Sequence, residues 1–358
     1  MTSRAFHGIQ DSMQETRKRD HIELTNKAQT GRPEVDSRFY YEPMQSAHPN
    51  SQTDISTTFL GKKISAPFWI SSMTGGVGEA RHINQNLARV CREFSLGMGL
   101  GSCRTLLDGD QYFADFNLRP ILGPDLPLFA NLGIAQVEKL VHSNNANKIF
   151  DMVNRLDADG LIVHVNPLQE WFQPEGDKFE FSPIVTIAKL CNANANRQYK
   201  IIVKEVGQGM GPKSLKALLE LPIDAIELAS FGGTNFSKLE LLRSQGTSVV
   251  EIEALSRVGH TSIEMISMLN NLLKANPKYM EKQIIISGGI ENFLDGFYLQ
   301  ELLSFSSIIG QAKNFLNRAE NYSDLIKFTE AQIEGLKMAR AFLTVKPRPN
   351  SSATPEVQ

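Results

Sequence analysis

The sequence has little cysteine, little net charge and no long apolar run, and each shortage excludes a class of protein. Its three cysteines form no CxxC pair, which argues against a disulfide framework or a zinc site and favours the reducing cytoplasm. A net charge of −2 provides no overall attraction to nucleic acid or to an anionic membrane. No apolar stretch approaches the roughly 20 residues that span a bilayer. We therefore expect a cytoplasmic globular protein without nucleic-acid or membrane partners, and its length favours an enzyme.

Short apolar runs, separated by helical patterns, recur along the chain. Each run is brief and almost continuously hydrophobic, as expected of a parallel strand that is covered on both faces. The eight runs are residues 66–73, 95–101, 126–133, 160–166, 199–207, 224–230, 283–289 and 306–312. Eight alternations of strand and helix fit a (β/α)8 barrel better than a doubly wound sheet, which usually has fewer strands. The sequence therefore predicts a TIM barrel of the α/β class.

The remaining segments define the predicted domain organisation. We expect one domain over residues 15–345, with flexible ends at 1–14 and 346–358, which are polar or aperiodic. The basic run RKRDHIEL, residues 17–24, precedes the barrel and is either a solvated helix face or an arm that folds over a site. A long segment at 231–258, after the sixth strand, contains Gly-Gly near its start and predicts a lid. Thr261 and Glu264 form a capping-box pattern that predicts the start of a helix.

Polar residues and glycines follow the predicted strands at the point where each strand ends. The stretches, in chain order, are MTGG (73–76), GSCR (101–104), NLG (131–133), HVNPLQE (164–170), KEVGQGM (204–210), ASFGGT (229–234) and SGG (287–289). Because active sites in such barrels are built at the carboxyl ends of the strands, these stretches predict one large ligand site. The glycine pairs are either a phosphate cradle of backbone N–H groups or tight turns that need positive φ.

Two cationic residues near strand ends suggest an anionic ligand. Lys204 lies inside an apolar strand, where a lysine should face an anion or an electron-rich ring nitrogen. The alternative is neutralisation by Glu205, but adjacent strand residues point to opposite faces. Arg104 can hold a phosphate with its planar guanidinium, and a surface arginine is the alternative.

Together these motifs resemble the flavin-dependent type 2 isopentenyl diphosphate isomerases. The resemblance covers residues 17 to about 345, and its most specific part is HVNPLQE combined with KEVGQGM. It implies an FMN-binding TIM barrel that interconverts isopentenyl and dimethylallyl diphosphate with Mg²⁺ and reduced FMN. It also implies NADPH as the reductant, no net redox change, and a homo-oligomer, tetrameric or larger. The physical chemistry agrees, because protonating the alkene creates a cation-like carbon that must be kept from water.

The resemblance also implies a role for each site residue. Residues expected to contact FMN are Met73, Thr74, Gly75, Gly76, Ser102, Asn131, Lys204, Thr234, Gly288, Gly289, Gln311 and Ala312. Residues expected to bind the substrate are Arg17, Lys18, His21, Ser102, Arg104, His164, Asn166 and Gln169. Glu170 is the expected Mg²⁺ ligand, and the catalytic residues are expected to be Gln169, Lys204 and His164. Their spacing suggests that His164 and Asn166 share one strand face, with Gln169 and Glu170 beyond the turn at Pro167.

Three positions depart from the family pattern. Cys103 replaces the usual glutamine of the GSxR motif, Phe236 replaces the usual tryptophan after GGT, and Glu291 replaces the common arginine after SGGI. The last change places an acid at the expected phosphate end of the cofactor. Two alternative functions are an FMN-dependent barrel oxidoreductase acting on a small 2-hydroxy acid, and a non-catalytic binding regulator. The first needs a His–Arg pair that the SGGI strand end lacks, and it would leave Glu170 idle. The presence of His164, Gln169 and Glu170 argues against the second.

Overall fold

The computed structural model describes residues 16–72, 80–196, 199–243 and 253–347. The chain divides into a larger unit, Glu42–Leu343, and a smaller unit made of Met1–Tyr41 and Thr344–Gln358. In the smaller unit, residues 16–24 are helical and exposed, and β1 (Phe39–Tyr41) pairs with β12 (Leu343–Val345).

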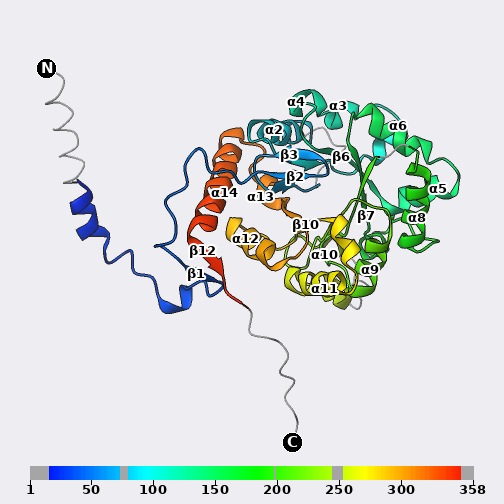
Figure 1. The fold of residues 1–358 in the computed structure, drawn as a ribbon. Helices are drawn as coiled ribbons and strands as arrows, with labels where there is room; N and C mark the ends of the chain where they lie inside the picture. The colour runs from blue at the N-terminus through cyan, green and yellow to red at the C-terminus, as the bar shows by residue number, and fades with distance from the viewer. Residues whose placement is uncertain (1–15, 73–79, 197–198, 244–252, 348–358) are drawn as a thin grey trace, which may run out of the picture. The chain divides into compact units, whose positions relative to one another are not determined.

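Eight parallel strands of the larger unit close into a barrel (Figure 1). Around the ring the strands follow one another from β4 to β11, which is their order along the chain. The last strand, β11, pairs with the first, β4, and closes the barrel. Their bounds are β4 Phe68–Ile70, β5 Gly97–Gly99, β6 Leu128–Gly133, β7 Gly160–His164, β8 Lys200–Lys204, β9 Ala225–Glu227, β10 Gln283–Ser287 and β11 Ser307–Gln311. Each of the eight predicted runs contains one of these strands, so the predicted TIM-barrel fold is confirmed.

Helices connect successive strands and surround the barrel in Figure 1. Their bounds are α2 Ala80–Glu93, α3 Phe113–Phe116, α4 Arg119–Leu122, α5 Ile134–His142, α6 Asn147–Arg155, α7 Pro167–Phe172, α8 Pro183–Asn194, α9 Pro212–Glu220, α10 Phe236–Arg243, α11 Ser262–Ala275, α12 Phe293–Leu302, α13 Lys313–Leu316 and α14 Tyr322–Phe342. The capping box predicted at Thr261 and Glu264 is present at the start of α11. Among the described residues, none of these helices combines the length and the apolarity that crossing a membrane requires.

A hairpin covers the amino-terminal end of the barrel. It consists of β2 (Thr57–Phe59) and β3 (Lys62–Ile64), joined through Leu60 and Gly61, which both have positive φ. The Leu60 N–H donates to Oε1 of Gln283, the first residue of β10, at 2.7 Å. The barrel core is apolar and includes Phe59, Ile64, Trp69, Phe129, Ile162, Ile202, Ala225, Ile285 and Ile308. This packed interior leaves the carboxyl ends of the strands as the place for a ligand site.

The register of neighbouring strands aligns polar residues at those carboxyl ends. Gly133 of β6 pairs with His164 of β7, His164 pairs with Lys204 of β8, and Lys204 pairs with Glu227 of β9. A histidine, a lysine and a glutamate therefore lie side by side on three adjacent strands. Parallel pairing places them about 4.8 Å apart along the hydrogen-bonding direction.

Candidate functional site

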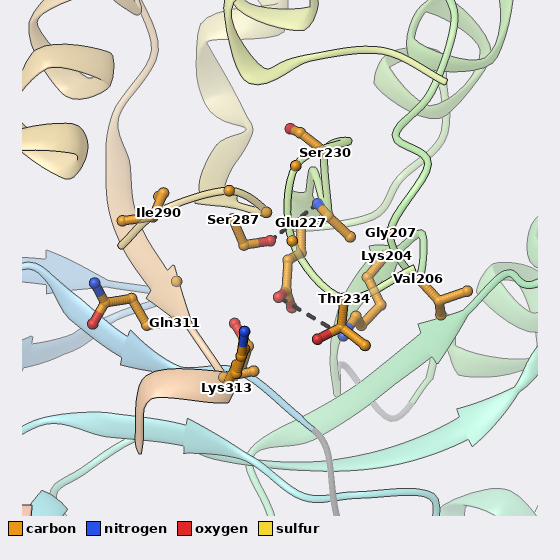
Figure 2. Close-up of a pocket in the computed structure, with 18 of the residues that line it drawn as sticks. Lys204, Val206, Gly207, Glu227, Ser230, Thr234, Ser287, Ile290, Gln311 and Lys313 are labelled. Atoms are coloured by element: carbon orange, nitrogen blue, oxygen red, sulfur yellow. Dashed lines mark hydrogen bonds and ion pairs between the residues drawn. The ribbon is translucent and has the colours of Figure 1, made fainter. Parts of the chain in front are cut away.

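A cavity of about 450 Å³ opens at the carboxyl ends of the strands (Figure 2). It brings together six residues that the sequence predicts for the cofactor: Lys204, Thr234, Gly288, Gly289, Gln311 and Ala312. Other polar residues in its wall are Ser71, Ser72, Glu227, Ser230, Ser287, Glu291, Lys313 and Asn314. The predicted residues Met73, Thr74, Gly75 and Gly76 lie outside the described part of the chain.

The glycine pairs bring two backbone loops of this cavity close together. Gly288 and Gly289 have φ values of +92° and +70°, and Gly232 has +119°. A Cβ atom on Gly288 would lie 2.2 Å from the carbonyl oxygen of Ser230, so no side chain fits there. The tight-turn explanation therefore holds for Gly232, Gly288 and Gly289. The same glycines line the cavity, so their backbone is also placed where a phosphate cradle of N–H groups would need it.

Several buried polar atoms in the cavity wall have no hydrogen-bonding partner among the described residues. They are Ser71 Oγ, Ser72 Oγ, Glu227 Oε2 and Gln311 Oε1. Buried polar groups in native proteins are almost always satisfied, so atoms of this kind indicate a bound polar ligand. A ligand with ring carbonyl, N–H, hydroxyl and phosphate groups, such as FMN, fits this set of donors and acceptors.

Lys204 is buried beside a carboxylate that the sequence analysis did not include. Its Nζ lies 3.8 Å from Oε1 of Glu227, and the side chains are 10% and 1% exposed. Glu205, by contrast, accepts hydrogen bonds from the backbone N–H groups of Gly207, Gln208 and Gly209. As expected from strand geometry, Lys204 is not neutralised by its neighbour Glu205. The only signal for Glu227 in the sequence is an acidic residue within the apolar run DAIELAS.

The HVNPLQE segment forms a hydrogen-bonded network at the end of β7, the strand that pairs with the strand of Lys204. Asn166 Nδ2 donates to Oε1 of Gln169 at 3.0 Å and to Oε1 of Glu170 at 2.9 Å. The Oδ1 atom of Asn166 is buried without a partner among the described residues. The prediction that His164 and Asn166 share a strand face is wrong, because β7 ends at His164 and Asn166 begins the turn into α7.

His164 is held as a neutral ring. Its Nδ1 lies 2.8 Å from Oδ1 of Asn131, whose Nδ2 donates to the carbonyl of Leu100, so Nδ1 carries the proton. Burial, assisted by the neighbouring Lys204 ammonium, lowers the pKa of His164 to about 3. The neutral ring therefore presents Nε2 as an acceptor, and it can donate to a phosphate only after it gains a proton.

We expect His164 to make the fold sensitive to acid. Its pKa is about 3 in the folded protein and about 6.5 in the unfolded chain, so the unfolded state binds more protons between these values. Stability should therefore fall as the pH drops from 6.5 towards 3. Thermal melts of wild type and His164→Gln over this range test the prediction. The Tm of the variant should fall less steeply, and parallel slopes would contradict it.

Glu170, the predicted metal ligand, is oriented by two contacts. Besides Asn166, its other oxygen accepts from the N–H of Asp177 at 2.8 Å. Asp177 also lies 3.4 Å from the guanidinium of Arg104, whose side chain is 60% exposed. Among the described residues no three His, Cys, Asp or Glu side chains group closely enough to hold a metal ion. A lone carboxylate such as Glu170 could hold Mg²⁺ only together with phosphate oxygens and water, which Mg²⁺ commonly takes as ligands.

Glu240 is a second acidic residue that the sequence analysis did not identify. It lies on α10, within the segment predicted as a lid, and is 4% exposed. Its Oε1 is 3.4 Å from Nε2 of Gln169, and its Oε2 is 2.9 Å from Arg243. Phe236, at the start of the same helix, lines the cavity. Part of the 231–258 segment is thus a helix that contacts the site, while residues 244–252 lie outside the described part.

The other predicted residues lie as follows. Ser102 and Arg104 are exposed beside the 3-10 turn Arg104–Leu107, and Cys103 between them is buried. The Cys103 N–H donates to the carbonyl of Asn131, which ties this loop to β6. Arg17, Lys18 and His21 are exposed on the helical residues 16–24 of the smaller unit. Their role at the site stays a prediction.

Fold and site together define a class of protein: a (β/α)8 barrel with a polar ligand cavity at the carboxyl ends of its strands. No family model matches the chain. It is 32% identical over 341 residues to an isopentenyl-diphosphate delta-isomerase of Chlorobium chlorochromatii (strain CaD3), covering 92% of each chain. It is 34% identical over 317 residues to one from Rickettsia akari (strain Hartford), covering 87% of each. The chain belongs to the isopentenyl-diphosphate delta-isomerase family.

Solved structures with the same barrel are more distant. The flavin-binding domain of baker's yeast flavocytochrome b2 gives a TM-score of 0.56 at 11% identity, covering 85% of this chain and 72% of that chain. A mandelate oxidase variant with 4-Br-2-hydroxy-methylphenylacetate gives 0.55 at 10% identity, covering 85% and 83%. These likenesses concern the fold alone. The barrel fits the type 2 group that the motifs resemble, so the predicted family is confirmed.

Proposed function

We propose that the protein interconverts isopentenyl diphosphate and dimethylallyl diphosphate with bound reduced FMN and Mg²⁺, and that NADPH is the reductant. One observation supports the proposal most strongly. In a chain of this family, the hydrogen-bonded network of Asn166, Gln169 and Glu170 follows the strand of His164. His164 pairs in the sheet with Lys204, which lines the polar cavity. The reaction moves a proton between carbons and involves no net redox change.

FMN is proposed to occupy the 450 Å³ cavity. The unpartnered buried atoms of Ser71, Ser72 and Gln311 support this proposal, because the ring and the side chain of FMN offer both donors and acceptors. The residues that would hold it are Ser102, Asn131, Lys204, Thr234, Gly288, Gly289, Gln311, Ala312 and residues 73–76. When bound and reduced, the flavin supplies an electron-rich surface and a group that donates or accepts a proton.

The substrate is proposed to lie between this cavity and the HVNPLQE network. Gln169 would sit beside the reacting carbons, positioned by Asn166 and Glu240. Glu170 would hold Mg²⁺, which would offset the negative charge of the diphosphate. The diphosphate would be held by Arg17, Lys18, His21, Ser102, Arg104, His164 and Asn166. His164 must gain a proton to donate to it, so we expect proton uptake when the substrate binds.

A direct assay tests the function and separates it from the alternatives. Purified protein is incubated with isopentenyl diphosphate in four arms: complete, without FMN, without reductant, and without Mg²⁺. We expect dimethylallyl diphosphate in the complete arm alone. Turnover of a 2-hydroxy acid with flavin reduction would instead support an oxidoreductase. FMN binding without turnover of either substrate would support a binding regulator.

The phosphate end of the proposed cofactor gives a further prediction. Glu291 replaces the family's arginine there, but Lys313 lines the same cavity and forms no ion pair with a described carboxylate. We expect Lys313→Gln to weaken FMN binding about fivefold, since a partly exposed charge pair contributes about 1 kcal/mol. Glu291→Gln should strengthen it by a similar factor. Fluorescence titrations measure both.

Riboflavin, which lacks the phosphate, is the matched control ligand. Its affinity should be unchanged by Lys313→Gln and by Glu291→Gln. Equal effects of Lys313→Gln on FMN and riboflavin would show that Lys313 does not meet the phosphate.

We also propose that the protein works in the cytoplasm as a homo-oligomer, tetrameric or larger. The buried free thiols of Cys91, Cys103 and Cys191 are compatible with a reducing compartment. Light scattering coupled to gel filtration tests the oligomer, and a monomer at micromolar concentration would contradict it.

A further inference from the structure

Glu227 is a buried carboxylate that neither the motifs nor the proposed roles explain. It ends β9, is 1% exposed, and lines the cavity next to Lys204. Glutamate is almost never fully buried unless it is paired. The strand register fixes its neighbour, because Lys204 and Glu227 are direct partners across β8 and β9.

The pairing between the two side chains is incomplete. Their closest atoms, Lys204 Nζ and Glu227 Oε1, are 3.8 Å apart, whereas a charge-assisted hydrogen bond is typically about 2.7–2.9 Å. The second oxygen, Oε2, has no partner among the described residues. Figure 2 shows the side chains of Lys204 and Glu227 pointing towards each other at the cavity, with a dashed line between them. The ammonium therefore keeps donors for a ligand, while the carboxylate balances its charge.

The charge balance around Lys204 depends strongly on this one carboxylate. His164, on the other side of Lys204 in the sheet, is neutral at physiological pH. Glu291 and Lys313 also line the cavity, but both are exposed and screened by solvent. A buried charge acts through a lower dielectric, so Glu227 offsets the positive field of Lys204 far more than Glu291 does.

We propose that Glu227 is a positioning residue that holds the Lys204 ammonium at the cavity wall and sets its net field on the bound cofactor. The inference rests on the proposed function, in which that cofactor is FMN. Reduction adds negative charge to the flavin ring, so a lysine without its counter-charge would favour the reduced form. Glu227 thereby limits the preference of the site for reduced over oxidised flavin.

The test is the reduction potential of bound FMN in the Glu227→Gln variant. We expect the affinity ratio of reduced to oxidised FMN to rise about tenfold, which is a shift of about +30 mV for a two-electron couple. The control is Glu291→Gln, which removes an acid from the same cavity without touching Lys204. Its shift should be clearly smaller. A Glu227→Gln shift no larger than that of Glu291→Gln would overturn the proposal.

A second comparison shows whether Glu227 acts through Lys204. In a Lys204→Met background, Glu227→Gln should move the potential by much less than in the wild type, and an undiminished shift would overturn the proposal. If Glu227→Gln fails to fold, Glu227→Asp is the second variant, because it moves the carboxylate away from Lys204 by one methylene. It should raise the affinity ratio of reduced to oxidised FMN about threefold, and an unchanged ratio would overturn the proposal.

The two failures are distinguishable. A wild-type protein that does not bind FMN would overturn both the proposed function and the role of Glu227. Bound FMN with an unmoved potential would overturn only the role of Glu227.

Discussion

Replacing Gln169 with alanine is expected to lower the kcat of isomerisation by about 10²–10³-fold, the usual contribution of a preorganised hydrogen-bonding group beside the reacting atoms. Gln169 lies between two anchors, accepting from Asn166 at 3.0 Å and donating to Glu240 at 3.4 Å. Its amide is thus fixed in the network that follows β7. Initial rates with isopentenyl diphosphate measure the effect. FMN affinity should be unchanged, because Gln169 does not line the FMN cavity.

Glu170→Ala is expected to have a comparable effect, with a different signature. If Glu170 holds Mg²⁺, added Mg²⁺ should partly restore the rate of the Glu170 variant but not that of the Gln169 variant. Gln173→Ala is the control for both. Gln173 is the same residue type as Gln169 one helical turn later, and its amide donates to Glu175 instead of the network. It should retain the parental rate, and parental rates for Gln169→Ala and Glu170→Ala would refute the assigned roles.

Replacing Lys204 with methionine is expected to raise the Kd for FMN about 10–100-fold. A hydrogen bond from a charged group contributes about 1.5–3 kcal/mol, and each 1.4 kcal/mol is a factor of ten in affinity. The variant should also lose stability, because removing Lys204 leaves Glu227 buried and unpaired, at a cost of about 3–5 kcal/mol. Flavin fluorescence titration and thermal melting measure the two effects.

The double variant Lys204→Met with Glu227→Gln separates these two effects. A neutral glutamine no longer needs a counter-ion, so the double variant should regain most of the lost stability. It should still bind FMN weakly, since the donor towards the flavin is absent. If the double variant regains parental FMN affinity, Lys204 acts only in folding and not in binding.

The barrel and the location of the site were predictable because both follow from local patterns. Each parallel strand is covered on both faces, so it reads as a short apolar run, and eight such runs define the barrel. Parallel strands end at the same edge of the barrel. The polar residues of HVNPLQE, KEVGQGM and SGG were therefore expected to lie together at that edge. Lys204 was identifiable because a lysine within IIVKEV has no local partner.

Other parts of the site depend on contacts between distant segments. Glu227 pairs with Lys204 through the β8–β9 register, which a single sequence does not reveal. Glu240 reaches Gln169 from α10, 71 positions further along the chain. Asn166 was placed with His164 by strand spacing, but the chain leaves the strand after His164, and the amide then turns towards Gln169 and Glu170.

The reaction proposed for this barrel is an isomerisation supported by a flavin that undergoes no net redox change. The most direct test follows isopentenyl and dimethylallyl diphosphate by NMR, starting separately from each compound, with FMN, Mg²⁺ and a measured amount of NADPH under anaerobic conditions. We expect both reactions to reach the same ratio of the two compounds, while NADPH is consumed only in the amount needed to reduce the bound FMN. Consumption of one NADPH per product molecule, or no interconversion from either side, would contradict it.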